Sequence, residues 1–253
     1  ADRGRKVDRQ PRGRQTHDGR PRDAGAEAGA LRRLVGAGGR AAGEGPAGGA
    51  ALPVTLLRDV LDRLRQCLDD LLWDAARLFE GAYHRGDAQA AAAARAAWRR
   101  LALDLDAALA TDVNTLLGTW IAEARATAGA PGGDEAELLE YNARDQVTLW
   151  GPGAWGISDY ARKHWSGLVA TYYVRGRWDI LFDAATASLR SGAPVDTNAT
   201  DAATLAYEIA WTKNATERFP TEPTADAFGV LSALVGRYFA PADAVLAAYT
   251  VAK

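Results

Sequence analysis

The sequence predicts an all-α fold, a bundle of about eight or nine helices in residues 52–253 that follows a disordered N-terminal segment. From Leu52 onward, apolar residues recur three and four positions apart, which is the spacing of one helix face. Clear β signals are absent, because short runs such as Val147–Trp150 are too isolated to build a sheet. Apolar residues make up 48% of the 253 residues and charged residues 25%. This balance is normal for a globular protein, and a domain of this size can bury a full core.

The first 51 residues differ in composition from the rest of the chain. Residues 1–50 contain 12 of the 26 glycines, 11 Lys and Arg against 6 Asp and Glu, and no aromatic residue. Such a segment buries too little apolar surface to offset the entropy of ordering it, so residues 1–51 are predicted to be disordered. A flexible linker and an RGG-like nucleic-acid tail are two interpretations. We favour a third, an artefact of a truncated or frame-disturbed gene, because the chain also contains no methionine.

Four helices are predicted in the first half of the helical region, each from its apolar spacing and its end signals. They are residues 54–80, residues 88–109, a helix that starts at Thr111-Asp112 and stops at Gly129, and residues 134–146. In the fourth, Asp134 and Glu137 have the spacing of a capping box. Four tryptophans fall on helical apolar faces in this region and beyond, and we expect them in the core: Trp73, Trp98, Trp120 and Trp211.

A glycine-rich stretch, residues 148–156, separates these helices from the second half of the chain. It carries Trp150 and Trp155, and a tryptophan in such a loop serves either as a hydrophobic anchor or as a platform for a ligand such as a sugar ring. Ser158 or Asp159 is expected to cap the next helix, which runs to Tyr173 and carries the interior histidine His164. The remaining predicted helices are residues 178–189, 201–215, 224–239 and 241–251.

Composition and motifs exclude several classes of function. The net charge of -2 argues against a nucleic-acid binder, and no run of about 18 apolar residues could cross a membrane. One cysteine and three scattered histidines leave no metal-ligand spacing, and neither a P-loop nor an HExxH motif is present, so we expect no cofactor. Three carboxylates flank the glycine-rich stretch and could form an acid–base pair, although helix capping and salt bridging suit them better: Glu140, Asp145 and Asp159.

Several rare residues recur in the order of a known family. Residues 142–152 read N-A-R-D-Q-V-T-L-W-G-P, residues 157–161 read I-S-D-Y-A, and residues 167–173 read G-L-V-A-T-Y-Y, followed by an R-W dipeptide. Upstream, residues 109–120 read L-A-T-D-V-N-T-L-L-G-T-W. Over about residues 54–240 the chain resembles the C-terminal helical domain of the alpha-N-acetylglucosaminidases, glycoside hydrolase family 89. The stretch between Pro152 and Ile157 is one residue longer than the usual form.

The resemblance implies a partner domain and a substrate. In this family two catalytic glutamates lie in a (β/α)8 barrel, which is missing from this chain, so the chain alone is predicted to be inactive. The helical domain lends the pocket for a terminal alpha-linked N-acetylglucosamine one wall, which by motif consists of Trp150, Ile157 and Tyr160. The parent enzyme is expected to be secreted or lysosome-like, and no targeting signal is visible in the chain.

Two interpretations of the function follow from the sequence. The first is the C-terminal fragment of a retaining exo-glycosidase, with the barrel and the glycan as its partners. The alternative is an independent, non-catalytic helical module that binds a sugar or another protein. Neither interpretation assigns a catalytic residue within this chain.

Overall fold

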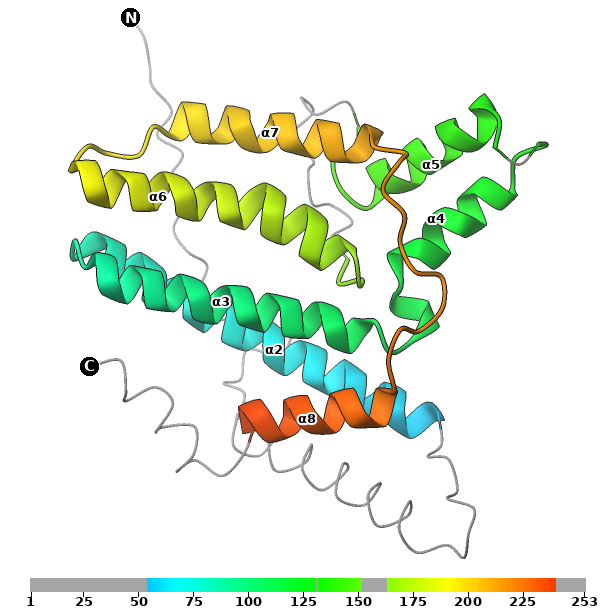
Figure 1. Ribbon diagram of the computed structural model, residues 1–253, viewed down its shortest axis with the longest axis horizontal. Helices are drawn as coiled ribbons and strands as arrows, with labels where there is room; N and C mark the ends of the chain where they lie inside the picture. Colours follow the sequence, from blue (N-terminus) through cyan, green and yellow to red (C-terminus); the bar gives the residue numbers. More distant parts are fainter. Residues whose placement is uncertain (1–53, 131, 152–162, 240–253) are drawn as a thin grey trace, which may run out of the picture.

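The computed structural model describes residues 54–130, 132–151 and 163–239, and within these ranges it contains helices and no strand (Figure 1). The all-α prediction is therefore confirmed. The α-helices are α2 (Val54–His84), α3 (Ala88–Leu109), α4 (Leu117–Ala126), α5 (Asp134–Gln146), α6 (Asp179–Ser191), α7 (Thr197–Lys213) and α8 (Ala227–Phe239). A short 3-10 helix, η1, spans Val113–Thr115, and a π-helix, η2, spans Val169–Trp178. The predicted helix at 241–251 lies outside the described residues, as does the predicted disordered segment.

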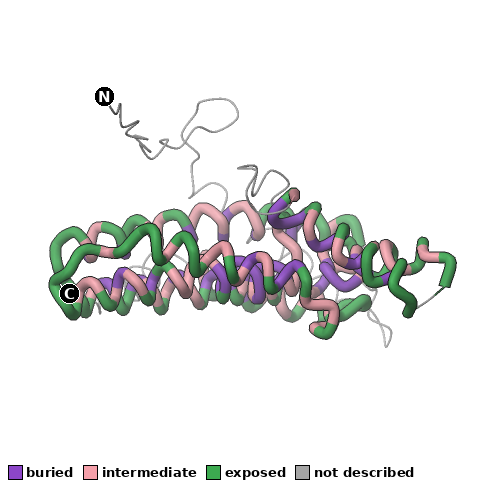
Figure 2. The backbone as a smooth tube through the Cα atoms, turned by 90° about the horizontal axis from the view of Figure 1, so that it is seen from above, coloured by how far each residue is buried: buried purple, intermediate pink, exposed green. Residues whose placement is uncertain are grey.

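The long helices lie side by side, and α4 and α5 form a hairpin at one end of the molecule (Figure 1). Helix α2 packs along α3, and α8 contacts both of them. Seen from above, the molecule is elongated along the long helices, and buried residues line the inner sides of the helix layers (Figure 2). None of the described helices combines the length and the apolar character that crossing a membrane requires.

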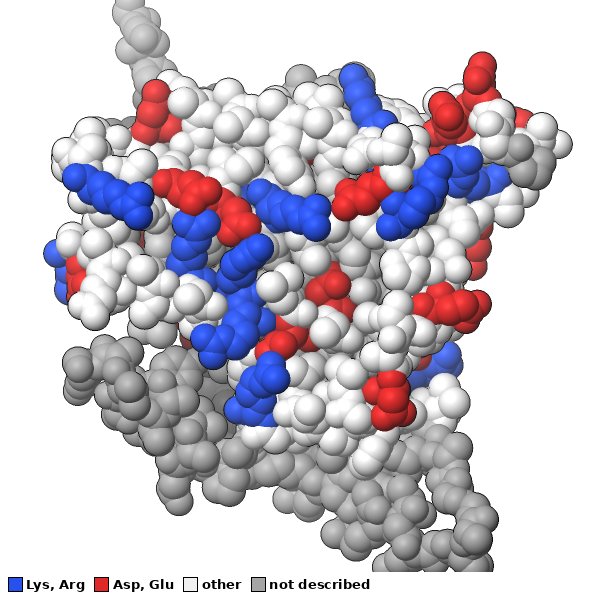
Figure 3. All heavy atoms as spheres, in the orientation of Figure 1, with Lys and Arg blue, Asp and Glu red and all other residues white. Residues whose placement is uncertain are grey.

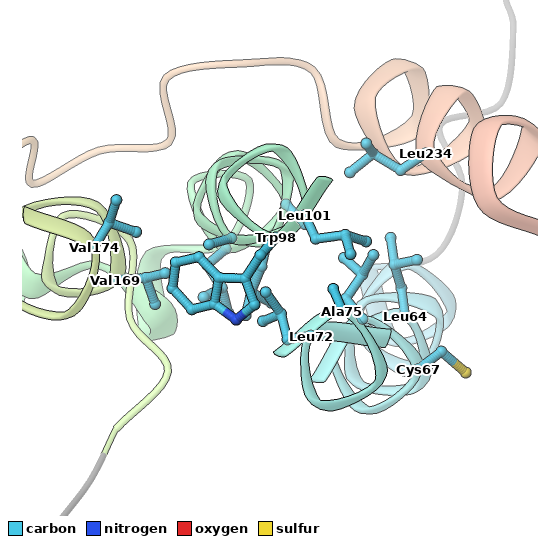
Figure 4. Packing of buried hydrophobic residues seen from close by; sticks show 14 of the residues in the cluster. Leu64, Cys67, Leu72, Ala75, Trp98, Leu101, Val169, Val174 and Leu234 are labelled. Atoms are coloured by element: carbon cyan, nitrogen blue, oxygen red, sulfur yellow. The ribbon is translucent and has the colours of Figure 1, made fainter. Parts of the chain in front are cut away.

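The larger core joins α2, α3, η2, α6 and α8. Trp98 of α3, only 4% exposed, lies at its centre, with its ring centroid 4.6 Å from that of Trp178 and 5.4 Å from that of Phe182. Figure 4 shows Leu72 of α2 beside it. Aromatic rings of this size bury a large apolar area, which is the main source of stability for such a helix array.

A smaller core joins α4, α5, η2 and α7. Its buried members include Leu117, Tyr172 and Trp211, and the side chain of Trp120 packs against it. The indole N–H of Trp120 donates to the carbonyl oxygen of Ala143 at 2.9 Å. The predicted burial of Trp98 and Trp211 is confirmed, and Trp120 is partly buried.

The prediction of Trp73 as a core residue is wrong, because half of its surface (50%) is exposed. Trp73 follows Leu72, a buried member of the α2 apolar face, by one position. One residue corresponds to about 100° of rotation on an α-helix, which turns Trp73 away from the core. Leu78, which the apolar spacing of residues 54–80 also predicts on that face, is 54% exposed.

Several helix boundaries also differ from prediction. Asp112 caps η1 rather than an α-helix, and α4 begins only at Leu117. The capping box is not formed, because Gly133 is the N-cap of α5, and Asp134 and Glu137 lie in the first turn, where carboxylates interact favourably with the helix dipole. His164 precedes the helix to which it was assigned, and its imidazole Nε2 lies 3.4 Å from Asp69 Oδ1.

Helices η2 and α6 follow each other without a break, although two separate helices were predicted. Gly176 lies inside this continuous stretch. A Cβ atom at this position would lie 2.2 Å from Cδ1 of Tyr207, so the glycine is required by the close approach of the ring.

Acidic and basic side chains alternate over the surface formed by α3, α6 and α7 (Figure 3). The pairs include Arg95 with Asp183 at 2.6 Å and with Asp179 at 3.3 Å. Ion pairs that remain partly accessible to solvent contribute little to stability.

Candidate functional site

The structure places one of the three predicted pocket residues. Trp150 follows the end of α5, whereas Ile157 and Tyr160 lie outside the described residues, as does Trp155. The described part of the site consists of the residues that support Trp150 and of the returning segment, which begins at residue 163.

Trp150 is presented by a reversal of the chain after α5. The three residues before it are buried, with exposures of 2% for Val147, 1% for Thr148 and 4% for Leu149. Trp150 itself is 38% exposed and has a φ of 54°, which is the left-handed region that bulky residues rarely adopt. Its backbone N–H donates to the carbonyl oxygen of Asp145 at 2.8 Å. Residues 147–149 thus form a buried anchor, and the half-exposed indole of Trp150 follows directly after it.

The hydroxyl of Thr148 connects this anchor to two helices, α5 and α7. It donates to the carbonyl oxygen of Arg144 in α5 at 2.6 Å and lies 3.3 Å from the hydroxyl oxygen of Thr212 in α7. Thr212 donates in turn to the carbonyl oxygen of Glu208 at 2.9 Å. Because these groups are buried, the hydrogen bonds restrict where the reversal can lie.

The end of α5 is fixed by a buried arginine. Arg144 is fully buried, and its guanidinium carbon lies 5.0 Å from the ring centroid of Trp211 and 5.2 Å from that of Phe219. Its Nη2 donates to the carbonyl oxygen of Glu217 at 2.8 Å. Among the residues that the structure describes, its Nη1 has no hydrogen-bond partner, and the two aromatic faces supply the electrostatic attraction that a cation needs there.

Glu140 compensates the charge of Arg144. Its Oε1 accepts hydrogen bonds from Arg144 Nε at 3.0 Å and Nη2 at 2.8 Å, and its Oε2 accepts one from Arg125 at 2.7 Å. Glu140 is 1% exposed, so its carboxylate is shielded from solvent and committed to arginines. This agrees with the salt-bridging interpretation of Glu140 rather than with an acid–base role. Asp145 holds Trp150 through its backbone, and Asp159 lies outside the described residues.

The returning segment is fixed by a second carboxylate, the partly buried Asp106 of α3. It accepts hydrogen bonds from the backbone N–H groups of Gly167 at 2.9 Å and Ala170 at 3.0 Å and from the hydroxyl of Ser166 at 3.2 Å. Burial raises the pKa of Asp106 above its usual value, although these hydrogen bonds act to lower it. Ser166 also pairs with the segment before α4, since its N–H donates to the carbonyl oxygen of Thr115 at 2.8 Å.

Sequence reasoning missed the residues that hold the site. Arg144 and Thr148 lie within the N-A-R-D-Q-V-T-L-W-G-P run, yet nothing in their local spacing shows that they are buried. Asp106 gives a weak signal, because it is a carboxylate between Leu105 and Leu109 on an apolar helix face. In the described part of the chain, no cluster of histidine, cysteine, aspartate and glutamate could hold a metal ion.

Comparison with known proteins identifies the family. Residues 53–237 match the family described as alpha-N-acetylglucosaminidase (NAGLU) C-terminal domain. Human alpha-N-acetylglucosaminidase is 36% identical over 135 residues, which cover 53% of this chain and 18% of the human protein.

Solved structures of the family 89 glycoside hydrolase of Clostridium perfringens share the fold. One, in complex with its substrate GlcNAc-alpha-1,4-galactose, has a TM-score of 0.65 and 26% identity, covering 75% of this chain and 22% of the bacterial one. Another, in complex with 2-acetamido-1,2-dideoxynojirmycin, has a TM-score of 0.72 and 23% identity over 86% and 24% of the two chains. The chain thus spans about a fifth of the length of these relatives. With most of its helical region matched, the chain belongs to the alpha-N-acetylglucosaminidase family and corresponds to the family's C-terminal domain.

Proposed function

We propose that this chain is the C-terminal helical domain of a retaining exo-glycosidase that removes terminal alpha-linked N-acetylglucosamine. In this proposal the domain forms one wall of the substrate pocket with Trp150, Ile157 and Tyr160. A barrel elsewhere in the enzyme supplies the catalytic carboxylates. The half-exposed Trp150, held in a left-handed conformation above a buried anchor, is the observation that carries the proposal.

The chemistry of the ligand fits this wall. A pyranose ring presents apolar C–H faces, and the flat indole of Trp150 matches such a face. The strained backbone of Trp150 supports a functional role, because residues in sparsely populated φ regions cluster at binding sites. The related bacterial enzyme, solved with GlcNAc-alpha-1,4-galactose, is the basis for the choice of sugar.

In the proposed reaction the domain binds and orients the sugar while the barrel performs both displacements. A retaining enzyme uses two carboxyl groups about 5 Å apart, one as nucleophile and one as general acid and then base. Trp150 excludes water from one side of the ring, which strengthens the electrostatic interactions that stabilise the transition state. Retention itself is checked by NMR of the first sugar released, which should be the α-anomer.

The test is the substitution Trp150→Ala in the full-length enzyme. Removal of a buried aromatic contact should cost about 2–4 kcal/mol, by analogy with binding hot spots. If the contact persists in the transition state, kcat/KM falls roughly 30- to 1000-fold. Tyr160→Phe removes a hydroxyl alone and should cost about 0.5–1.5 kcal/mol if that hydroxyl bonds a neutral sugar group.

The matched control is Trp98→Phe, in the larger core. This variant should lower the melting temperature and leave kcat/KM of the folded enzyme unchanged. Should Trp150→Ala behave like this control, losing melting temperature and keeping kcat/KM, Trp150 would be a packing residue and the proposed pocket wall would be wrong.

A further inference from the structure

The reversal that presents Trp150 is held by side chains that are themselves shielded from solvent. We propose that Thr148 is a positioning residue, which together with Arg144 keeps Trp150 in its left-handed, half-exposed conformation. Its consequence for catalysis rests on the function proposed above, whereas the positioning itself does not.

Trp150 needs such support because its own backbone preference opposes its conformation. Among the described residues it is the one non-glycine with a positive φ; the others are Gly86, Gly132, Gly151, Gly167 and Gly192. Glycine is the default residue at such a position, since a Cβ atom makes the left-handed region unfavourable. A tryptophan persists there only where the surrounding structure fixes it.

The side chain of Thr148 supplies part of this support, and the backbone of Trp150 supplies the rest. The threonine hydroxyl donates to the carbonyl oxygen of Arg144, four residues earlier, while the backbone N–H of Trp150 donates to the carbonyl oxygen of Asp145. The hydroxyl of Thr148 also lies 3.3 Å from that of Thr212 in α7. The chain reversal is therefore hydrogen-bonded to the last turn of α5 and also contacts α7.

Arg144 makes this last turn a rigid base. Its side chain reaches Glu140 within α5 and the carbonyl oxygen of Glu217 beyond α7, and it lies against the rings of Trp211 and Phe219. With neither Thr148 nor Arg144 more than 1% exposed, neither side chain can contact a ligand directly. This separates a positioning role from direct binding.

The experiment uses the 253-residue chain labelled with 5-fluorotryptophan and observed by ¹⁹F NMR. The resonance of Trp150 is assigned by its loss in Trp150→Phe. Thr148→Val removes the hydroxyl and keeps the shape. The matched control is Thr186→Val in α6, where the hydroxyl donates to the carbonyl oxygen of Phe182, also four residues earlier and at 2.6 Å.

We expect Thr148→Val to shift or broaden the Trp150 resonance and to leave that of Trp98 in place. Thr186→Val should leave the Trp150 resonance unchanged, and Thr148→Ser, which keeps the hydroxyl, should restore it. A Trp150 resonance that coincides in Thr148→Val and in the unmodified chain would overturn the proposal. If Thr148→Val does not fold, Thr148→Ser and Glu140→Gln, which weakens the hold on Arg144, decide the question by the same resonance.

In the full-length enzyme, Thr148→Val should lower kcat/KM about 3- to 10-fold, the effect of one lost neutral hydrogen bond. Thr148→Ser and Thr186→Val should keep it. The two proposals can fail separately. A Trp150→Ala enzyme with full kcat/KM would contradict the proposed pocket wall, whereas a ¹⁹F shift in Thr148→Val would still support the positioning role of Thr148.

Discussion

Two tryptophans, Trp73 and Trp98, differ in what their side chains contribute to stability. Trp98 is 4% exposed and packs on Trp178 and Phe182, whereas Trp73 is 50% exposed on α2. Trp98→Ala should lower the free energy of unfolding by about 3–5 kcal/mol, because it opens a cavity that neighbouring side chains only partly fill. Trp73→Ala should change it by less than about 1 kcal/mol, as is usual at exposed positions.

Urea denaturation of the two alanine variants and the unmodified chain checks this prediction. The slope with denaturant should stay the same, so that the shift in midpoint reports stability alone. Equal losses in the two variants would contradict the exposed position of Trp73 and return it to the core.

Helix η2 begins where Asp106 of α3 accepts its first backbone N–H groups. Removal of such a cap in Asp106→Ala should lower the free energy of unfolding by about 1–2 kcal/mol. Because the folded-state pKa of Asp106 is raised, the folded state binds its proton more readily than the unfolded state does. The contribution of Asp106 is then largest below the unfolded-state pKa and decreases as pH rises through the folded-state value.

Asp112, the cap of η1, provides the control with the opposite sign. Burial acts to raise the pKa of Asp112, but the hydrogen bonds from Arg58 and Asn114 outweigh it and the pKa is lowered. Its contribution is present above the unfolded-state value and is lost as pH falls through the folded-state value. Unfolding at several pH values should therefore show the loss in Asp106→Ala shrinking, and that in Asp112→Ala growing, from acidic to neutral pH. Parallel curves would contradict both assignments.

Local sequence was sufficient for some elements and not for others. The helices at 88–109 and 134–146 were predicted at the bounds of α3 and α5, because the apolar spacing and the glycines at their ends are local signals. The continuity of η2 with α6 was not predicted. The need for a glycine at Gly176 comes from the ring of Tyr207 in α7, a contact that the local sequence does not reveal. π-helical geometry is rare and has no local signature of comparable strength.

The candidate site, too, could be predicted only in part from the local sequence. Trp150 was proposed as a site residue from its motif, but the roles of Arg144 and Thr148 depend on α7 and on the segment that follows it. The rings of Trp211 and Phe219 lie far from Arg144 in sequence and meet it only in the fold. No spacing rule within one helix could bring these groups together.

Across the whole molecule, η2 belongs to both cores. Val169 and Val174 pack into the larger core, while Tyr172 and Tyr173 pack into the smaller one. The segment that returns from the candidate site thus leads directly into the element that connects α2 and α3 with α4, α5 and α7. A displacement of this element would reach both cores, so we interpret the described helices as one packed unit.

This unit should not hydrolyse glycosides by itself. Retaining hydrolysis needs a nucleophilic carboxylate and an acid about 5 Å apart on a bound sugar, and the proposed enzyme draws both from its barrel. Among the described residues, the two buried carboxylates are paired with arginines, Glu140 with Arg144 and Arg125 and Glu208 with Arg177. The partly buried Asp106 accepts hydrogen bonds from the start of η2. We expect the purified 253-residue chain to release no nitrophenol from 4-nitrophenyl α-N-acetylglucosaminide above the uncatalysed rate, while a full-length enzyme releases it in the same assay. Release that increases with the concentration of the pure chain, and that survives removal of traces of other glycosidases, would show that the chain carries its own catalytic groups and that the barrel is not required.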